Sequence, residues 1–233
     1  MQTLRAIIFD KDGTLFNFHA TWAAWAADFL TDLSGGDTNR AQFLGDQLGF
    51  DMASQTYAPD SPVIAGTPEE IASHLLPHLP GMSAAHLVLH MNEAAACAPM
   101  KEAAPLIPLL DTLKARGLAL GVATNDGEHP ARAHLQSAGI ETRFDFIAGC
   151  DSGFGAKPAP GQLQAFARHV SLPPSQITMV GDSRHDLLAG RAAGMTTIGV
   201  LTGLALAEDL HDLADAILPD IGHLPGWLDG AST

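Results

Sequence analysis

Four short polar clusters hold the residues of this chain whose types and spacing could do chemistry. They read Asp10-Lys11-Asp12-Gly13-Thr14, Thr124-Asn125-Asp126, Lys157-Pro158-Ala159-Pro160 and Gly181-Asp182-Ser183-Arg184-His185-Asp186. Each falls at or just after the carboxyl end of an apolar run of strand length. Carboxylates, a threonine hydroxyl and an ammonium group are the side chains that phosphoryl transfer from a monoester requires.

In this chemistry Asp10 is the predicted nucleophile, which would form an aspartyl-phosphate. A carboxylate is repelled from a phosphate dianion by about 10 kcal/mol at ~3.5 Å when the effective dielectric constant is about 20. Lys157 is therefore a predicted catalytic cation, and Asp10 and Asp182 would hold Mg²⁺ through oxygen ligands. Asp12 is the predicted general acid and base, which would protonate the leaving alkoxide and then activate water.

Thr124 and the amide of Asn125 are predicted to hold phosphate oxygens together with Lys157. Thr124 is also placed where it could cap the following helix, and the two roles are compatible. Ser183 and Asp186 have the spacing of a capping box, with the acid at the third helical position. Asp186 is therefore either a helix cap or a group in or next to the metal shell.

The elements that must position these clusters alternate along the chain. Apolar runs of strand length cover residues 4–9, 118–123, 144–148, 177–180, 196–200 and 214–218, and helical patterns cover 103–116, 128–138, 160–170, 184–193 and 206–212. This alternation predicts an α/β fold with a doubly wound, mainly parallel, Rossmann-like sheet. In such sheets ligands bind beyond the carboxyl ends of the strands, where all four clusters would meet.

More than a hundred residues separate the first two predicted strands, far more than a crossover needs. Most of this interval has helical patterns, including 19–33, a helix start at Thr67-Pro68-Glu69-Glu70, and 83–98. We therefore expect an inserted all-helical domain at about 16–99. The catalytic core would then be discontinuous and consist of 1–15 and 100–233.

The four clusters in this order resemble the motifs of the haloacid dehalogenase (HAD) superfamily, and the insertion resembles the cap domain of its phosphoglycolate-phosphatase-like branch. The resemblance implies a Mg²⁺-dependent phosphatase with Asp10 as nucleophile and Asp12 as acid and base. It also implies that Asp182 binds the metal, with Asp186 in or beside its shell, and that the backbone carbonyl of Asp12 touches it. Lys11 departs from the pattern, because a hydrophobic residue is commoner in the family at that position.

Two other readings remain open on the residues alone. Sugar-phosphate mutases of the same superfamily keep both aspartates and share the cap type, so these motifs do not separate them from phosphatases. A receiver-like module, phosphorylated on an aspartate without turnover, also combines acids, a hydroxyl and a lysine around Mg²⁺. Such modules are about half this length, and the second aspartate and the large insertion favour turnover.

Charge and composition narrow the class of partner. The 233 residues carry 26 acidic and 12 basic side chains, a net charge of −14, which argues against nucleic acid or an anionic membrane as the main partner. No apolar stretch is long enough to span a bilayer, and the one at the amino terminus is too short for a signal peptide, so we expect a cytoplasmic protein. As a separate expectation, the protein is a monomer or a homodimer.

The charges of the insertion bear on the substrate. Arg40 is the one strongly basic residue between 16 and 99, beside nine acids. We therefore expect a small phosphate monoester whose leaving group is small or largely uncharged, unless Arg40, a histidine or a helix amino terminus binds a second anion. Phosphoglycolate is the leading named candidate from the family resemblance.

Overall fold

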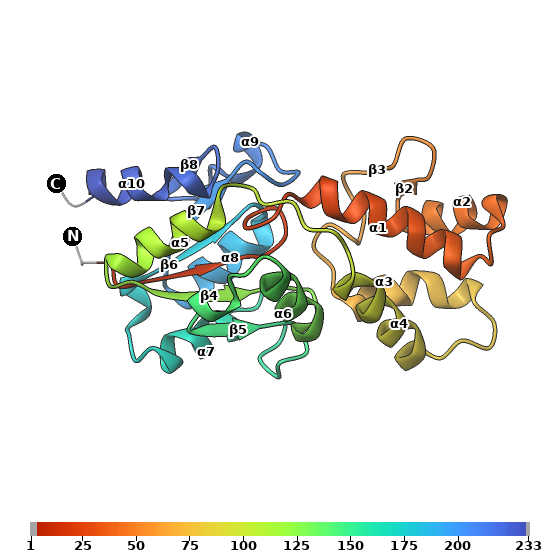
Figure 1. The fold of residues 1–233 in the computed structure, drawn as a ribbon, viewed down its shortest axis with the longest axis horizontal. Coiled ribbons are helices and arrows are strands. Elements are labelled where there is room, and N and C mark those ends of the chain that lie inside the picture. The colour runs from red at the N-terminus through yellow and green to blue at the C-terminus, as the bar shows by residue number, and fades with distance from the viewer. Residues whose placement is uncertain (1–3, 232–233) are drawn as a thin grey trace.

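A six-stranded parallel sheet forms the centre of the larger part of the molecule (Figure 1). The computed structural model describes residues 4–231. The strand order is β5-β4-β1-β6-β7-β8, and every neighbouring pair is parallel. The strands are β1 (Ala6–Phe9), β4 (Ala119–Ala123), β5 (Phe146–Ala148), β6 (Ile177–Gly181), β7 (Thr196–Val200) and β8 (Ala216–Leu218). All six coincide with predicted apolar runs, which confirms the α/β fold class.

Helices cover both faces of this sheet, because successive side chains of β1 point to opposite sides. Ile7 and Phe9 join one apolar cluster, with residues of α5, α6 and α10, whereas Ala6 and Ile8 join another, with residues of α7 and α8. These helices are α5 (Leu106–Ala115), α6 (Glu128–Ser137), α7 (Gly161–His169), α8 (Arg184–Ala193), α9 (Ala207–Leu210) and α10 (Leu224–Ala231). Short 3₁₀ turns are η2 (Glu141–Arg143), η3 (Pro174–Gln176) and η4 (Ile221–His223).

Most of the segment between β1 and α5 forms a separate lobe with its own apolar cluster (Figure 1). It contains α1 (Phe18–Leu33), α2 (Thr38–Gln47), α3 (Pro68–Leu75), η1 (Leu76–His78) and α4 (Ala84–Ala96). The lobe is mainly helical, but the expectation that it is all-helical was wrong, because it also contains a two-stranded antiparallel pair, β2 (Phe50–Asp51) and β3 (Thr56–Tyr57). We call this lobe the cap. Its boundaries at 16 and 99 remain our proposal.

Local sequence signals explain where the cap helices begin. Thr67 accepts a hydrogen bond from the Glu70 N–H, and the Glu70 carboxylate accepts one from the Thr67 N–H, which makes a complete capping box at the start of α3. Ser83 caps α4 through the N–H of His86, and Asn17 caps α1 through the N–H of Ala20.

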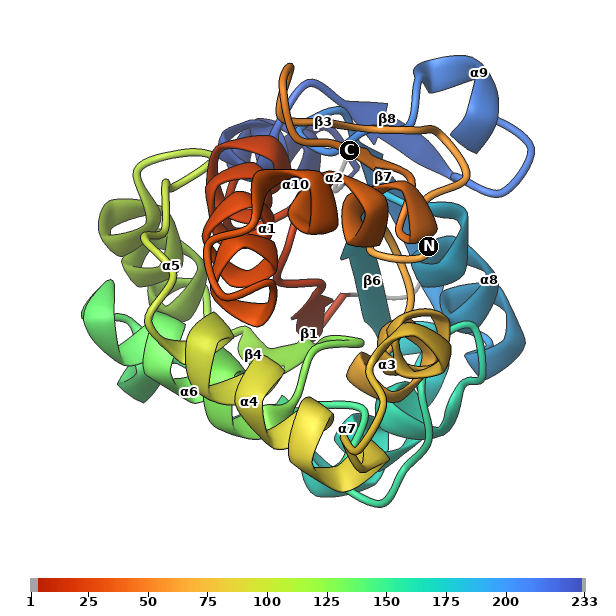
Figure 2. The same ribbon diagram turned by 90° about the vertical axis from the view of Figure 1, so that its right-hand side faces the viewer.

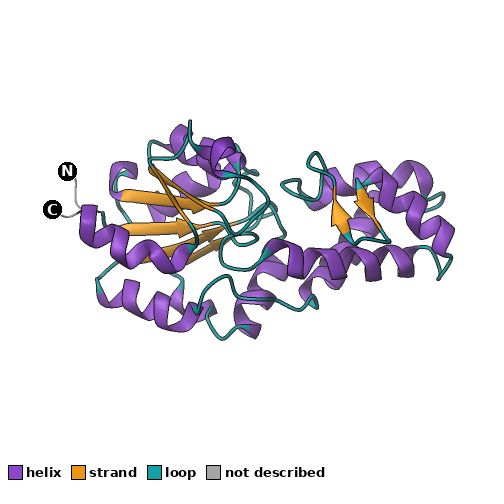
Figure 3. Ribbon diagram, turned by 90° about the horizontal axis from the view of Figure 1, so that it is seen from above, coloured by secondary structure: helices purple, strands orange, loops and turns teal. Residues whose placement is uncertain are grey.

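The two chain segments that join cap and sheet run side by side (Figure 3). The Asn17 N–H donates to the Lys101 carbonyl at 2.8 Å, and the Ala103 N–H donates to the Leu15 carbonyl at 2.9 Å. The cap thus projects from the carboxyl end of β1 and lies over that edge of the sheet (Figure 2). Within residues 4–231, no helix has the length and apolarity that crossing a bilayer requires.

Candidate active site

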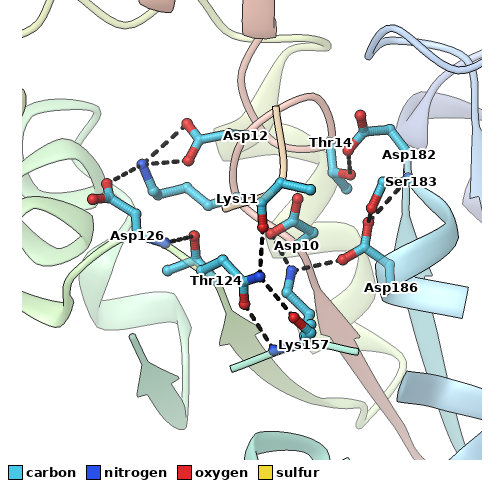
Figure 4. Close-up of polar contacts among 12 residues, drawn as sticks. Asp10, Lys11, Asp12, Thr14, Thr124, Asp126, Lys157, Asp182, Ser183 and Asp186 are labelled. Carbon is cyan, nitrogen blue, oxygen red and sulfur yellow. Dashed lines mark hydrogen bonds and ion pairs between the residues drawn. The ribbon is translucent and has the colours of Figure 1, made fainter. Parts of the chain in front are cut away.

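The central strands bring the predicted functional residues to one pocket at the carboxyl edge of the sheet (Figure 4). Because β1 lies between β4 and β6, Asp10, Thr124 and Asp182 follow three adjacent strands. The loop after β5 adds Lys157. Asp12, Asn125 and Asp186 line the same pocket, so all seven predicted side chains lie together.

Lys157 is buried and joins two of the carboxylates. Its Nζ lies 2.6 Å from Asp10 Oδ1 and 2.6 Å from Asp186 Oδ1. Burial lowers the pKa of Lys157, but the attraction of Asp10 and Asp186 outweighs burial, and the pKa lies above its ordinary value. The ammonium group is therefore charged wherever the enzyme would work, and one of its partners is the predicted nucleophile.

The carboxylates of Asp10, Asp182 and Asp186 form a buried group whose nearest oxygens all lie within 4.8 Å of one another. Burial raises the pKa of Asp10 to about 7, and Asp186 and Asp12 also raise it, against the opposing effect of Lys157. Burial, followed by repulsion from Asp186 and Asp10, raises the pKa of Asp182 well above its ordinary value. One buried lysine does not balance three acids, so this donor set fits a divalent cation with oxygen ligands.

Asp186 caps a helix and also lies within the group of three carboxylates. Its Oδ2 accepts hydrogen bonds from the Ser183 N–H at 3.0 Å and from the Ser183 hydroxyl at 2.7 Å, which caps α8. Its Oδ1 contacts Lys157 and belongs to the three-carboxylate group. The cap interaction fixes the carboxylate beside the cluster.

Mg²⁺ should bind more tightly as the pH rises, by about tenfold between about pH 6 and pH 8, because Asp10 must lose its proton before it can act as a ligand. A carboxyl with a raised pKa is protonated below that pKa, so protons compete with the metal on the acid side. Calorimetric titration in two buffers of different ionisation enthalpy would measure both the affinity and the protons released. An affinity that does not change across this range would contradict the prediction.

A backbone turn brings Asp12 close to the group of three carboxylates, but the Asp12 carboxylate does not belong to that group. Gly13 has φ +83°, and a Cβ at this position would lie 2.3 Å from a carboxylate oxygen of Asp182, so the turn requires glycine. The carboxylate of Asp12 points instead to Lys11, whose Nζ lies 3.0 Å from Oδ1 and 2.8 Å from Oδ2 (Figure 4).

Lys11 is a functional candidate that our sequence interpretation did not identify. Its side chain is fully buried, and its Nζ also contacts Asp126 Oδ2 at 2.9 Å and His134 Nδ1 at 2.9 Å. Burial lowers the pKa of Lys11, but the attraction of Asp12 and Asp126 outweighs burial, so the pKa lies above its ordinary value. The available signal was a lysine between two aspartates directly after a buried strand; nothing in the sequence indicated its partners.

His134 connects this cluster to the cap. Its Nε2 lies 2.6 Å from the Ala95 carbonyl in α4, so Nε2 donates and Nδ1 accepts from Lys11. Burial, followed by the charge of Lys11, lowers the pKa of His134 and favours this neutral form. Trp22 from α1 covers the Lys11 ammonium, with its ring centroid 5.3 Å from Nζ. Lys11, which contacts Asp12, is thus linked to the cap helix α1 through Trp22 and to the cap helix α4 through His134.

Replacing Lys11 by methionine should lower kcat/KM for an alkyl phosphate by about 10–100-fold, because Asp12 loses the ammonium that orients it. The loss should be smaller for p-nitrophenyl phosphate, whose leaving group needs no proton. Comparing the two esters separates a positioning role from general damage, and thermal unfolding controls for stability. An equal loss for both esters would contradict a positioning role.

Thr124 and Asn125 line the same pocket as Lys157. The Thr124 hydroxyl oxygen accepts from the Asp126 N–H at 3.1 Å, which leaves its O–H free to donate. The Asn125 side chain holds the Lys157 backbone, with the Lys157 N–H donating to Oδ1 at 2.8 Å and Nδ2 donating to the Lys157 carbonyl at 2.9 Å. It also donates to the Ala65 carbonyl in the cap at 2.7 Å.

Comparison with known proteins places the chain in a family. Residues 4–194 match the haloacid dehalogenase-like hydrolase family. The match covers most of the sequence and all four polar clusters, and the chain belongs to this family. The resemblance inferred from the motifs is thereby confirmed.

Particular relatives share its sequence or its fold. A phosphoglycolate phosphatase of Rhodospirillum rubrum is 34% identical over 122 residues, 52% of this chain and 51% of the relative, so the chain spans about half the length of such curated relatives. A phosphoglycolate phosphatase of Xanthomonas campestris is 27% identical over 90% of this chain and 88% of its own.

Two solved structures resemble the whole fold. One, described as a predicted phosphoglycolate phosphatase from Haemophilus somnus, has a TM-score of 0.74 at 21% identity, over 97% of this chain and 99% of its own. The other, a β-phosphoglucomutase from Clostridium difficile, has a TM-score of 0.67 at 16% identity, over 99% of both chains. At these identities the likeness concerns the fold alone, and both kinds of enzyme share it.

Proposed function

We propose that the protein is a Mg²⁺-dependent phosphomonoester hydrolase that works through an aspartyl-phosphate on Asp10. The observation that supports this most strongly is the contact of a buried ammonium group, Lys157, with Asp10 inside a group of three carboxylates. The Lys157 ammonium supplies positive charge beside Asp10. This charge offsets the repulsion between the Asp10 carboxylate and a phosphate dianion.

In the first step one Asp10 oxygen attacks phosphorus, an Asp10 O–P bond forms, and the P–O bond to the leaving group breaks. Asp12 gives its proton to the departing alkoxide. In the second step Asp12 takes a proton from water, whose oxygen attacks phosphorus and displaces Asp10 as a carboxylate. Inorganic phosphate leaves, and both aspartates return to their starting states.

Other groups of the chain would bind and orient the phosphoryl group. Lys157 and the Thr124 hydroxyl would hold two of its oxygens, and the backbone N–H of Asn125 donates to no other group within residues 4–231. Asp10, Asp182 and Asp186, with the Asp12 backbone carbonyl, would hold Mg²⁺. When bound, the ion supplies positive charge that offsets repulsion between Asp10 and the phosphate.

We propose a small phosphorylated metabolite as substrate, and phosphoglycolate as the first named compound to test, because curated relatives carry that activity in their names. A cytoplasmic location and a monomeric or homodimeric state remain part of this proposal. The alternative of a sugar-phosphate mutase differs in the fate of the phosphoryl group, which returns to sugar instead of passing to water.

The test measures phosphate release from p-nitrophenyl phosphate with Mg²⁺ and with EDTA. We expect release only with the metal. A second assay with a hexose 1-phosphate identifies the product: free phosphate supports the hydrolase, and an isomerised sugar phosphate would favour the mutase. Stable phosphorylation of Asp10 without release would favour the receiver-like module.

A further inference from the structure

The pocket continues from the phosphate-binding residues into the cap, where its lining changes in character. Every cap residue that lines the pocket is uncharged. This statement applies to the whole cap, because the structure describes all of residues 16–99. Phe18, Trp22 and Trp25 of α1 form one side, which we call the aromatic wall. Ile71 and Met91 are among the aliphatic residues that complete the lining.

The structure disfavours each of the three routes by which the cap could bind a second anion. Arg40 lies exposed on α2, with Nη2 near the His78 carbonyl, and does not line the pocket. The amino terminus of α3 does reach the pocket, but its capping box uses the N–H groups of Thr67 and Glu70, Pro68 has no N–H, and the acids Glu69 and Glu70 stand in its first turn. No cap histidine is among the lining residues.

The core side of the pocket would repel a second anion. Five acids line it, against Lys157 as the one lysine or arginine among the lining residues, and His185 is the one histidine. Lys11 lies beneath Asp12 and is already paired with two acids. A carboxylate on the leaving group would lose water without gaining a cation, which is the costly case for a buried charge.

Two neutral polar groups stand within this apolar lining. Asn92 of α4 lines the pocket, and its amide makes no hydrogen bond to another residue within 4–231. The indole N–H of Trp25 is buried and has no hydrogen-bond partner. The Asn92 amide fits a hydroxyl, ether or carbonyl oxygen on a ligand, and neither group provides the charge that would select a carboxylate.

We infer that the cap is a subsite for the phosphate monoester of a neutral alcohol with an apolar or aromatic body and an uncharged polar group. This inference rests on the proposed function for the phosphate end of the ligand. It disfavours phosphoglycolate, whose leaving group carries a carboxylate, as the substrate that the enzyme prefers.

The binding test uses a double variant, Asp10→Asn with Trp227→Phe, in the presence of Mg²⁺. The first substitution stops turnover, and the second removes the tryptophan outside the pocket, so that fluorescence reports on Trp22 and Trp25. The ligands are phosphoglycolate, its analogue in which a neutral amide replaces the carboxylate, and benzyl phosphate. We expect the amide analogue and benzyl phosphate each to bind about tenfold or more tightly than phosphoglycolate. Equal or tighter binding of phosphoglycolate would overturn the subsite.

A charge added to the cap provides an independent test with a gain as its readout. Ile64 lines the pocket and is half-buried, so Ile64→Lys should tighten phosphoglycolate binding by about tenfold. Leu89→Lys on the exposed face of α4 is the matched control for the change in net charge, and it should give no such gain. If both variants respond equally, the subsite is contradicted.

The outcomes also separate the two proposals. If the binding preference is as expected but wild-type protein releases no phosphate from any ester, the proposed hydrolase is wrong and the subsite stands. If phosphate is released and phosphoglycolate is preferred over its amide analogue, the hydrolase stands and the subsite is wrong. If none of the ligands binds, the subsite is overturned, and phosphate release by the wild-type protein decides the hydrolase separately.

Discussion

Replacing Asp10 by asparagine will lower kcat for phosphate ester hydrolysis by about 10⁴-fold or more, because an amide oxygen is a poor nucleophile and no acyl phosphate can form. The substitution changes few other interactions of the site, since Lys157 keeps its contact with Asp186. Steady-state hydrolysis of p-nitrophenyl phosphate measures the loss.

The structure predicts that this loss is not a folding defect. The pKa of Asp10 is raised to about 7, mainly by burial, so ionised Asp10 destabilises the folded, metal-free protein above this pH. A neutral amide at this position removes that destabilisation. The melting temperature of metal-free Asp10→Asn should therefore equal or exceed that of wild type at pH 8. Asp28→Asn, on the exposed side of α1, is the matched control and should keep full activity. Substantial turnover by Asp10→Asn would exclude Asp10 as nucleophile.

Replacing Asp12 by asparagine will lower kcat/KM for an alkyl phosphate by about 10²–10⁴-fold, the usual contribution of a general acid. The same substitution should affect kcat/KM for p-nitrophenyl phosphate much less, because nitrophenolate leaves without a proton. Asparagine retains the backbone carbonyl predicted to contact the metal. It also removes one ion pair of Lys11, which keeps its other partner, Asp126.

The ratio between the two esters is therefore the informative quantity for Asp12. Mg²⁺ affinity, measured by calorimetry, should stay close to that of wild type. Full activity of Asp12→Asn on the alkyl ester would exclude the acid and base role, and a loss of metal affinity would indicate that the side chain itself binds the metal.

The sequence was sufficient to predict the sheet and most helices, because buried parallel strands leave continuous apolar runs and cap residues mark helix starts. Thr67 caps α3 as its residue type indicated, and α4 begins after Ser83, where the predicted amphipathic segment starts. The helix α2 was missed, because only three of its residues are buried and its apolar pattern is weak. Strands of two residues, such as β2 and β3, carry no periodicity that could be recognised.

The candidate site was predicted to a similar extent. Motif order and strand ends were enough to bring Asp10, Thr124, Lys157 and Asp182 together. They did not indicate the contact of Lys11 with His134, because 123 positions separate the two residues. Two contacts bring the cap to this cluster, one from the Ala95 carbonyl of α4 and one from the Trp22 ring of α1. The uncharged lining of the cap was foreshadowed by its shortage of basic residues; which residues face the pocket depends on tertiary packing.

The most direct test of the central claim is to locate the phosphoryl group during turnover. Wild-type protein with Mg²⁺ and excess ester is quenched in acid within milliseconds, digested and analysed by mass spectrometry. The account predicts one added phosphoryl group on the peptide that contains Asp10, assigned to that residue by borohydride reduction of the acyl phosphate, and none in Asp10→Asn. Rapid hydrolysis with a phosphoryl group on another residue, or with an Asp10 peptide that stays unmodified throughout turnover, would contradict it.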